Sequence, residues 1–302
     1  MREMMGLHVK LIKVEDSSSL LVERAMYTRR YTLSLDRNKC VGCELCEAAC
    51  PKEAIKIVKP SDLKDLEEPP KRITVAILED KCNFCGICSE ICVFGAFKQS
   101  IDGKEFVPVL ESESFPKIIH EVKVDVSKCP PSCRICEEAC PLHLINVKSD
   151  ADGKVVNVEV DREHCPGCRI CEVKCPYNAI HARKIITGVM RVNSEMCPEG
   201  CRECVGACPI PGVLSVSEDG KINVNEVFCV YCGACRKACP VNGAIDLRRI
   251  SVYHMPVKSG AWNKALERLT STIDMTKELR SKSTFKACDS VKRLQIGGHA
   301  RK

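Results

Sequence analysis

The sequence is poor in aromatic side chains and in long apolar segments. Aromatic residues make up 4% of its 302 residues, with a single tryptophan, so we do not expect a core built from large rings. No stretch approaches the roughly 20 apolar residues that a membrane-spanning helix needs. The opening residues MREMMGLHVKLIKVED lack the apolar segment of a secretory signal. A nucleotide-dependent enzyme is not expected either, because the chain has no GxGxxG motif and no phosphate-binding loop.

Cysteine, in contrast, is abundant, with 25 residues of which 24 fall into six runs of four. The first run, at residues 40–51, reads CVGCELCEAACP, and the others begin at residues 82, 129, 165, 197 and 229. A motif that recurs at intervals of roughly 20–50 residues indicates a repeated structural unit. Cys288 lies outside this register, and we expect it to be a plain thiol.

Disulfides, zinc and iron-sulfur clusters are the chemistries that use clustered thiols. The strict repetition and the missing secretory signal argue against a disulfide framework. Structural zinc sites join two ligand pairs a dozen or more residues apart, whereas here three thiols crowd into seven residues and none of the seven histidines recurs in register. The irons of a 4Fe-4S cube sit at separate corners, so one tight loop can supply three of its ligands. The pattern C-x2-C-x2-C-x3-C-P is the bacterial ferredoxin signature, which indicates 4Fe-4S clusters.

The third and fifth runs carry one extra residue and therefore also match the CxxxCxxC motif of radical SAM enzymes. They read CPPSCRIC (129–136) and CPEGCREC (197–204). A fourth cysteine and a proline follow each of them on ferredoxin spacing, and only 24 residues separate Cys140 from Cys165. A catalytic α/β barrel needs on the order of 200 residues. Radical chemistry is therefore not expected.

The six runs together resemble a polyferredoxin, a concatenation of bacterial two-cluster ferredoxins, over about residues 31–250. The second run departs from the pattern, with Val93 in place of the proline. The resemblance implies an α+β fold of three tandem two-cluster ferredoxin domains, each made of two ferredoxin-like βαβ halves. The expected domains are residues 31–112, 113–186 and 187–253, between an N-terminal extension (1–30) and a C-terminal docking helix with a basic tail (254–302).

In bacterial ferredoxins the fourth cysteine of one run ligates the other cluster of the pair. The extra residue of the third and fifth runs alternates with the regular fourth and sixth runs, which favours pairing of consecutive runs. The crossed rule then gives six ligand sets: set 1, Cys40, Cys43, Cys46 and Cys92; set 2, Cys82, Cys85, Cys88 and Cys50; set 3, Cys129, Cys133, Cys136 and Cys175; set 4, Cys165, Cys168, Cys171 and Cys140; set 5, Cys197, Cys201, Cys204 and Cys239; set 6, Cys229, Cys232, Cys235 and Cys208. A nested pairing of distant runs remains open.

Short β-like stretches flank every run. Those before the runs are YTLSLD, ITVAILE, HEVKVDV, KVVNVEV, GVMRVN and KINVNEV, and those after them are AIKIV, GAFKQS, LINVK, AIHARKI, VLSVS and AIDLRRI. We expect one helical turn to begin at each fourth cysteine. We also expect an exposed insertion at residues 59–72, a linker at 99–117, and close contact between the second and third domains across the short junction at 184–192.

Cluster binding changes the charge of the chain. The formal charge is +6. Binding would remove 24 thiol protons, and six oxidised cores would return about +2 each, so the loaded protein would carry about −6. Nucleic-acid binding is therefore not expected. Domains of this size are marginal without added support, so we expect the clusters to serve as cores and the apoprotein to be largely unfolded.

Two groups of apolar residues leave alternatives open. Aromatic side chains near the runs either exclude water from a cluster or simply pack: Phe84, Phe94, Phe97, Tyr177 and Tyr231. The segment 261–280 has Trp262, Leu266, Leu269 and Ile273 at helical spacing, a stripe that either packs on its own chain or docks a partner.

A cluster with four thiolate ligands has no vacant iron, so we expect one-electron exchange and no catalytic site in this chain. The segments FPKIIHEVKVDVSKCP and AWNKALERLTS resemble the polyferredoxin subunit of formylmethanofuran dehydrogenase in methanogenic archaea, although six clusters are fewer than is typical of it. This resemblance implies a cytoplasmic subunit that carries low-potential electrons for CO2 reduction at a molybdenum or tungsten site in another subunit. The partners would be a molybdenum or tungsten dehydrogenase, or alternatively a hydrogenase or heterodisulfide reductase. A soluble carrier or electron reservoir is the alternative function.

Overall fold

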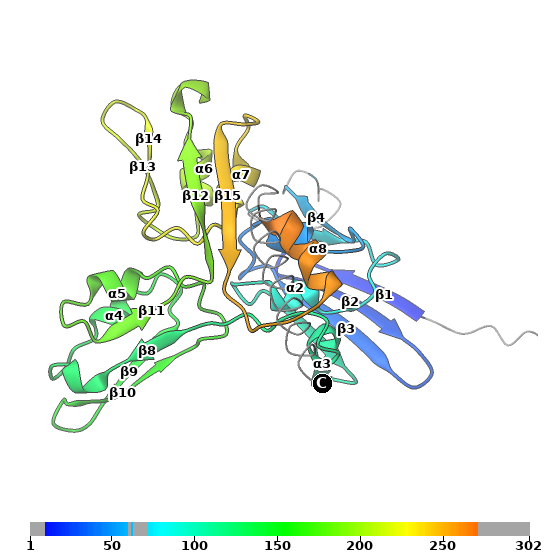
Figure 1. Cartoon of the computed structure of the whole chain (residues 1–302), viewed down its shortest axis with the longest axis horizontal. Helices are drawn as coiled ribbons and strands as arrows, with labels where there is room; N and C mark the ends of the chain where they lie inside the picture. The colour runs from blue at the N-terminus through cyan, green and yellow to red at the C-terminus, as the bar shows by residue number, and fades with distance from the viewer. Residues whose placement is uncertain (1–9, 60–61, 63–71, 271–302) are drawn as a thin grey trace, which may run out of the picture.

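The structure is a computed structural model that describes residues 10–59, 62 and 72–270. Figure 1 shows three lobes that meet near the centre of the molecule. Each lobe is built around one pair of cysteine runs, and we call them the first, second and third units in chain order. The fold is mixed α+β, and the expected strands before and after every run are present.

The first unit sets the pattern of the other two. Its elements are β3 (Arg30–Asp36), α1 (Leu45–Ala49), β4 (Ile55–Val58), β5 (Thr74–Ile77), α2 (Ile87–Glu90) and β6 (Phe97–Ile101). The outer strands β3 and β6 pair antiparallel, and so do the inner strands β4 and β5. Helices α1 and α2 contact each other. Each run therefore lies between an outer and an inner strand, and the two runs of a unit face one another.

The second and third units repeat this topology. The second comprises β8 (Val122–Val124), α4 (Ile135–Glu138), β9 (Ile145–Ser149), β10 (Val155–Val160), α5 (Ile170–Lys174) and β11 (Ile180–Ala182). The third comprises β12 (Ile186–Val192), α6 (Glu203–Ala207), β13 (Leu214–Val216), β14 (Ile222–Val224), α7 (Ala234–Ala238) and β15 (Ile245–Val252). In each unit the two outer strands again pair antiparallel with each other, and so do the two inner strands. A short 3-10 turn precedes the third and the fifth run: η2 (Val126–Lys128) and η3 (Ser194–Met196).

The helical turns do not begin at the fourth cysteine, so that prediction is wrong. Helices α1, α5, α6 and α7 instead end just before it, with the cysteine as the C-terminal cap. Cys50 has φ −68° and ψ 114°, an extended conformation. The proline that follows disfavours helical geometry at the preceding residue, which stops the helix there.

Residues on either side of the first unit's runs fold onto it. Strands β1 (Lys10–Glu15) and β2 (Ser19–Ala25) extend its outer pair into a five-stranded sheet, in the order β1-β2-β3-β6-β7. Leu20 and Val22 are fully buried in this sheet. The segment 99–117, expected to be a linker, contains the end of β6, then β7 (Lys104–Glu105) and α3 (Pro108–Glu111), and Phe115 is buried. Most of this segment therefore belongs to the first unit.

The C-terminal helix α8 (Gly260–Leu269) packs on α1 of the first unit. Its cap is Ser259, whose hydroxyl accepts a hydrogen bond from the backbone N–H of Ala261 at 3.1 Å. Trp262, Leu266 and Leu269 are buried, so these residues of the predicted stripe pack within the chain and are not available to a partner. Ile273, the basic tail and Cys288 lie outside the described residues. In the part of the chain that the structure describes, no helix is long and apolar enough to cross a membrane.

The units do not share their cores equally. One large apolar cluster joins residues of the first unit, the third unit and α8. Most of the second unit has a separate, smaller core: Val122, Ile145, Val147, Val155, Val158, Cys171, Ile180 and Ala182. The first and third units therefore form one body although the second unit separates them in the sequence.

Candidate iron-sulfur sites

Three internal cavities are each lined by four cysteines. Their cysteines are Cys50, Cys82, Cys85 and Cys88 in the first; Cys140, Cys165, Cys168 and Cys171 in the second; and Cys208, Cys229, Cys232 and Cys235 in the third. In each cavity three cysteines come from one run and the fourth from the run before it. These groups coincide with sets 2, 4 and 6.

The other twelve cysteines are grouped through their electrostatic effects on one another. Burial raises the pKa of Cys46 well above its ordinary value, and the neighbouring Cys92 and Cys40 raise it further. Burial also raises the pKa values of Cys129 and Cys197. Nearby Cys133 and Cys175 add to the first shift, and Cys239 and Cys201 add to the second. The structure thus brings the runs together in the crossed arrangement of sets 1, 3 and 5, while the ligand assignment itself stays a prediction.

The spacing of the thiols suits a cluster better than a single ion. Among the described residues, no three His, Cys, Asp or Glu side chains converge tightly enough to hold one metal ion. In three of the sets the four thiols line one cavity together with apolar side chains. A cube with one iron at each of four corners needs its ligands spread in this way, whereas tetrahedral zinc needs them close together.

A left-handed residue shapes every cysteine loop. The residue directly before the second cysteine has a positive φ in all six runs: Gly42, Phe84, Ser132, Gly167, Gly200 and Tyr231. This turn aims backbone N–H groups back toward the first sulfur, as in the 3.4 Å contact from Tyr231 N to Cys229 Sγ. The cysteine spacing alone does not reveal this turn, although glycine at three of the six positions is a usable signal.

Backbone N–H groups also reach the fourth cysteine. The residue four positions later donates to its sulfur in the first four runs: Ala54 to Cys50, Ala96 to Cys92, Leu144 to Cys140 and Ala179 to Cys175, at 3.3–3.4 Å. Such hydrogen bonds stabilise negative charge on sulfur and help to set the reduction potential of a cluster.

Crowded, buried thiols are hard to ionise without a cation. Burial raises the pKa values of Cys43 and Cys88 well above their ordinary range, and neighbouring cysteines raise them further. In the third unit, burial is the largest cause that raises the pKa of Cys232 to about 12. Iron supplies the positive charge that offsets this cost, so binding and folding are coupled. The thiol sets therefore fit 4Fe-4S clusters.

The sets differ in exposure. The first three cysteines of sets 1 and 6 are all buried, as are Cys168 and Cys171 of set 4. All four cysteines of set 3 are partly exposed, and so are those of set 5 except Cys204. The second and third units thus have one better-shielded and one more accessible site each.

The better-shielded sets 1, 4 and 6 face one another where the units meet. Cys232 of set 6 lies close enough to Cys43 of set 1 to raise its pKa, after the larger effect of burial. A Cβ added to Gly95, near set 1, would lie 1.7 Å from the ring of His164, the residue before set 4. Between the second and third units, the ammonium of Lys184 donates to the Glu226 carbonyl at 2.5 Å. The second unit thus contacts the first through His164 and the third through Lys184, so the expected closeness of the second and third units is present.

The aromatic residues singled out in the sequence do not share one role. Phe84 and Tyr231 are buried and line the cavities of sets 2 and 6. Phe94 and Phe97 are buried in the core of the first unit, whereas Tyr177 is 44% exposed. Phe84 and Tyr231 are therefore placed to keep water from sets 2 and 6.

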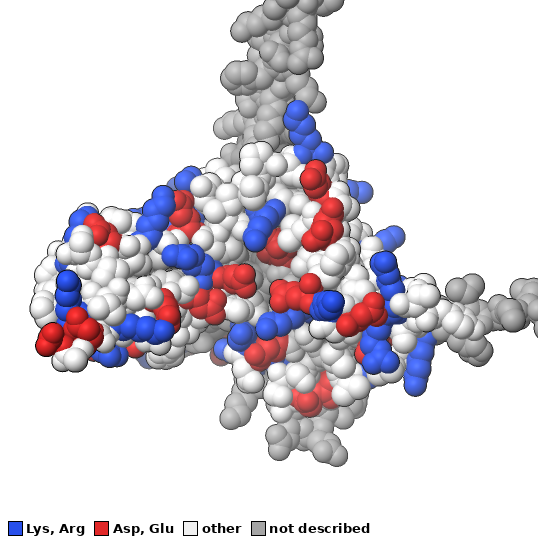
Figure 2. All heavy atoms as spheres, turned by 90° about the horizontal axis from the view of Figure 1, so that it is seen from below, with Lys and Arg blue, Asp and Glu red and all other residues white. Residues whose placement is uncertain are grey.

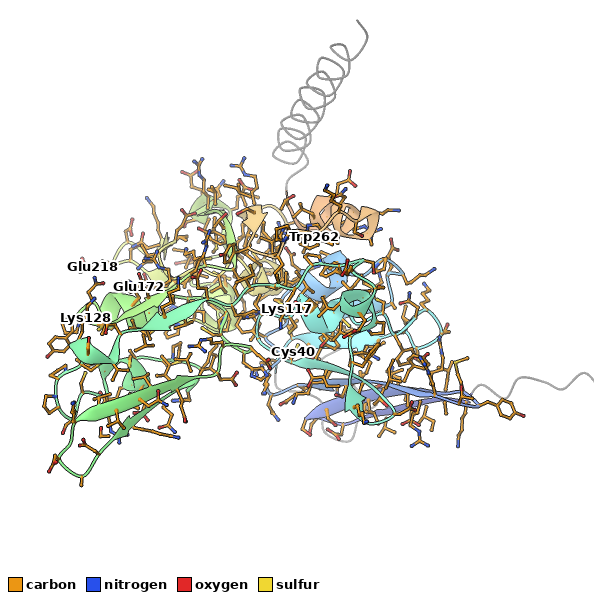
Figure 3. The ribbon with its side chains drawn as sticks, turned by 60° about the horizontal axis from the view of Figure 1, so that its bottom comes forward. Cys40, Lys117, Lys128, Glu172, Glu218 and Trp262 are labelled. Atoms are coloured by element: carbon orange, nitrogen blue, oxygen red, sulfur yellow. The ribbon has the colours of Figure 1, made fainter. Side chains whose placement is uncertain are left out.

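Charges of both signs occur on one face of the molecule. On the face drawn in Figure 2, Lys and Arg are interspersed with Asp and Glu. Figure 3 marks Lys128 and Glu172 in the second unit and Trp262 in α8. Glu172 accepts hydrogen bonds from Arg169 at 2.8 and 3.2 Å, which lower its pKa.

Known proteins share these features. A 4Fe-4S dicluster domain model matches residues 39–96, and a 4Fe-4S binding domain model matches residues 158–181. NADH-quinone oxidoreductase subunit I of Pelobacter propionicus is 34% identical over 68 residues, which cover 22% of this chain and 37% of that protein. A polyferredoxin-like protein of Methanocaldococcus jannaschii is 27% identical over 96 residues, 30% of this chain and 57% of that protein. Each match thus spans less than two thirds of the relative.

A solved structure matches most of the chain. It is a chain of the formate dehydrogenase–heterodisulfide reductase–formylmethanofuran dehydrogenase complex from Methanospirillum hungatei, with 31% identity and a TM-score of 0.76. The match covers 86% of this chain and 91% of that one. The fold and the thiol sets define an iron-sulfur electron-transfer protein. Within that class the chain is a polyferredoxin-like 4Fe-4S protein, as the cysteine runs predicted.

Proposed function

We propose that this chain holds six 4Fe-4S clusters and conducts low-potential electrons as a cytoplasmic subunit of a formylmethanofuran dehydrogenase complex. The observation that supports this proposal is the structural match of 86% of this chain to 91% of a chain from a complex that contains this enzyme. Each cluster would supply reversible one-electron exchange. The residues of the chain bind the clusters, exclude water from them and hold the three units in contact.

Sets 1 to 6, as defined above, are the proposed ligands. In this arrangement each unit holds two clusters whose cysteines cross between its two runs. Sets 1, 4 and 6 would form an inner group, and sets 2, 3 and 5 would lie toward the ends of the three lobes. Electrons could therefore enter or leave through any lobe, which suits a subunit that connects several redox partners.

Two double variants test the crossed ligation. If Cys46 and Cys92 belong to one cluster, C46S/C92S alters a single cluster, whereas C46S/C50S alters two. If each run binds its own cluster, the two results exchange places. The measurement is the iron content, with the number of changed signals in electron paramagnetic resonance, for protein prepared without oxygen.

Purification from the native organism tests the assignment to a complex. The tagged chain is isolated without oxygen, and mass spectrometry identifies and quantifies the co-purifying subunits. Stoichiometric molybdenum or tungsten dehydrogenase subunits would support the proposal. If only hydrogenase subunits co-purify, the chain belongs to a different complex and the proposal is wrong. A chain that elutes alone with reducible clusters would instead be a mobile carrier, and the proposal of a fixed subunit would be wrong.

A further inference from the structure

A buried ion-pair network joins the first unit to the third. Arg249 Nη2 lies 2.7 Å from Glu44 Oε1, and the two side chains are only 2% and 8% exposed. Arg236 also binds this carboxylate, with its Nε 3.2 Å from Glu44 Oε2. Glu44 is on the loop of the first run, whereas both arginines come from the third unit. The contact therefore closes the interface between the two units.

The network touches the loops of two cysteine sets. Glu44 directly follows Cys43 of set 1 in the sequence. Arg249 donates to the backbone carbonyls of Tyr231 and Cys232, at 2.7 and 2.9 Å, in the loop of set 6. The Glu44 N–H points at the same Cys232 carbonyl, with a nitrogen–oxygen distance of 3.4 Å. One carboxylate and one guanidinium thus lie between the two sets.

Gly233 makes this close approach possible. Its φ of +91° is in the left-handed region, and an added Cβ would lie 2.8 Å from Glu44 Cδ and 2.9 Å from Arg249 Nη2. A side chain at this position would therefore push the carboxylate and the guanidinium away from the loop. Gly233 thus combines a left-handed turn with the absence of a side chain where the two loops meet.

A buried ion pair is a weak source of stability, because the cost of removing both charges from water offsets much of their attraction. Its fixed charges, however, act strongly on neighbouring groups in a medium of low dielectric constant. A nearby cation favours the more negative, reduced state of a cluster, and a nearby anion disfavours it. The geometry therefore has a consequence for reduction potential that apolar packing would lack.

We propose that Glu44 and Arg249 are positioning residues for electron transfer between sets 1 and 6. They hold the two loops face to face and bias the reduction potentials in opposite directions, Arg249 upward and Glu44 downward. One electron passes between the two sets. This inference rests on the proposed cluster binding, but it does not depend on which complex contains the chain.

The test is a redox titration of the purified chain, followed by electron paramagnetic resonance. In R249Q, one transition should move to lower potential; in E44Q, one should move to higher potential. The double variant E44Q/R249Q should return close to the wild type. R249K, which keeps the charge, should also stay close to it. The matched control is R37Q, because Arg37 is a buried arginine whose guanidinium binds the Glu15 carboxylate at 2.9 Å and the Asp16 carbonyl, and not Glu44.

The signs decide between an electrostatic and a merely structural role. Shifts of the same direction in R249Q and E44Q, or no shift in either, would overturn the proposal. If R249Q fails to load iron, E44Q and R249K still test the proposal. One transition should move to higher potential in E44Q, and R249K should stay close to the wild type. A C235S background removes a ligand of set 6 and should abolish the R249Q shift. Loss of clusters in the wild type itself would count against the proposed function rather than against this inference.

Discussion

The imidazole of His164 lies against the α-carbon of Gly95, where the second unit meets the first. A Cβ added to Gly95 would be 1.7 Å from His164 Cδ2. The ring is held by Asp161, whose Oδ2 lies 2.5 Å from His164 Nδ1. Gly95 follows Cys92 by three residues, and His164 directly precedes Cys165. This contact therefore keeps sets 1 and 4 in register.

We expect G95A to loosen the contact between the first and second units. Gly95 has a φ of +59°, and Gly103 has a φ of +79° with no atom within 4 Å of an added Cβ. Both alanine variants carry the backbone strain of about 1 kcal/mol, but only G95A adds a clash, worth roughly 1–3 kcal/mol more. Anaerobic thermal unfolding and limited proteolysis of residues 113–121 compare the two. Equal behaviour would show that the contact contributes nothing.

Removal of iron should unfold the second unit first. Its apolar core is small, whereas the first and third units share a larger one that includes Leu20, Leu33 and Leu45. Metal binding contributes folding free energy, so its loss is felt most where other burial is least. Hydrogen exchange after anaerobic chelation is the measurement, with residues 122–182 expected to lose protection earliest. Retained native-like circular dichroism after complete chelation would contradict the expected dependence on clusters.

F84A should destabilise the first unit and expose set 2. Phe84 is 2% exposed, lines the cavity of set 2 and has the Arg24 guanidinium 5.0 Å from its ring centroid. Truncation of a buried phenylalanine costs roughly 3–5 kcal/mol, and water would gain access to the sulfurs. The readouts are the unfolding free energy and the rate at which oxygen bleaches the cluster absorbance. F106A is the control because Phe106 is 38% exposed, and a comparable loss there would argue against a specific role for Phe84.

W262A should detach α8 from the first unit. The indole is 2% exposed and meets the ring of Phe115 edge to face, with 4.9 Å between centroids. Its loss should cost about 3–5 kcal/mol and free Arg268, which donates to the Cys50 carbonyl at 2.9 Å. Anaerobic denaturant unfolding measures the effect. W262F keeps most of the ring packing and should lose much less, so an equal loss in both variants would assign the effect to the indole N–H instead.

The strands could be predicted from the sequence, whereas the helical turns and the left-handed residues could be predicted only in part. The strands on either side of each run follow from short β-rich stretches, and the structure contains them. The helical turns end at the fourth cysteine instead of beginning there, because a proline such as Pro51 disfavours helical geometry at the residue before it. The positive φ of Phe84 and Tyr231 was hidden, because an aromatic residue in a left-handed turn contradicts ordinary preference and is held there by the loop around the cluster. The fate of Trp262 could not be decided, since an amphipathic helix packs equally well on its own chain or on a partner.

The chemistry of this protein follows from the spacing of its cysteines. The spacing of thiols along a covalent loop limits which metal group they can reach, and six runs of nearly the same spacing favour 4Fe-4S clusters. The arrangement of the units, in contrast, depends on contacts between folded surfaces. Glu44 and Arg249 meet across 205 residues, and Gly95 meets His164 from another unit. Such contacts depend on the shapes of folded surfaces and on desolvation, which no local pattern encodes.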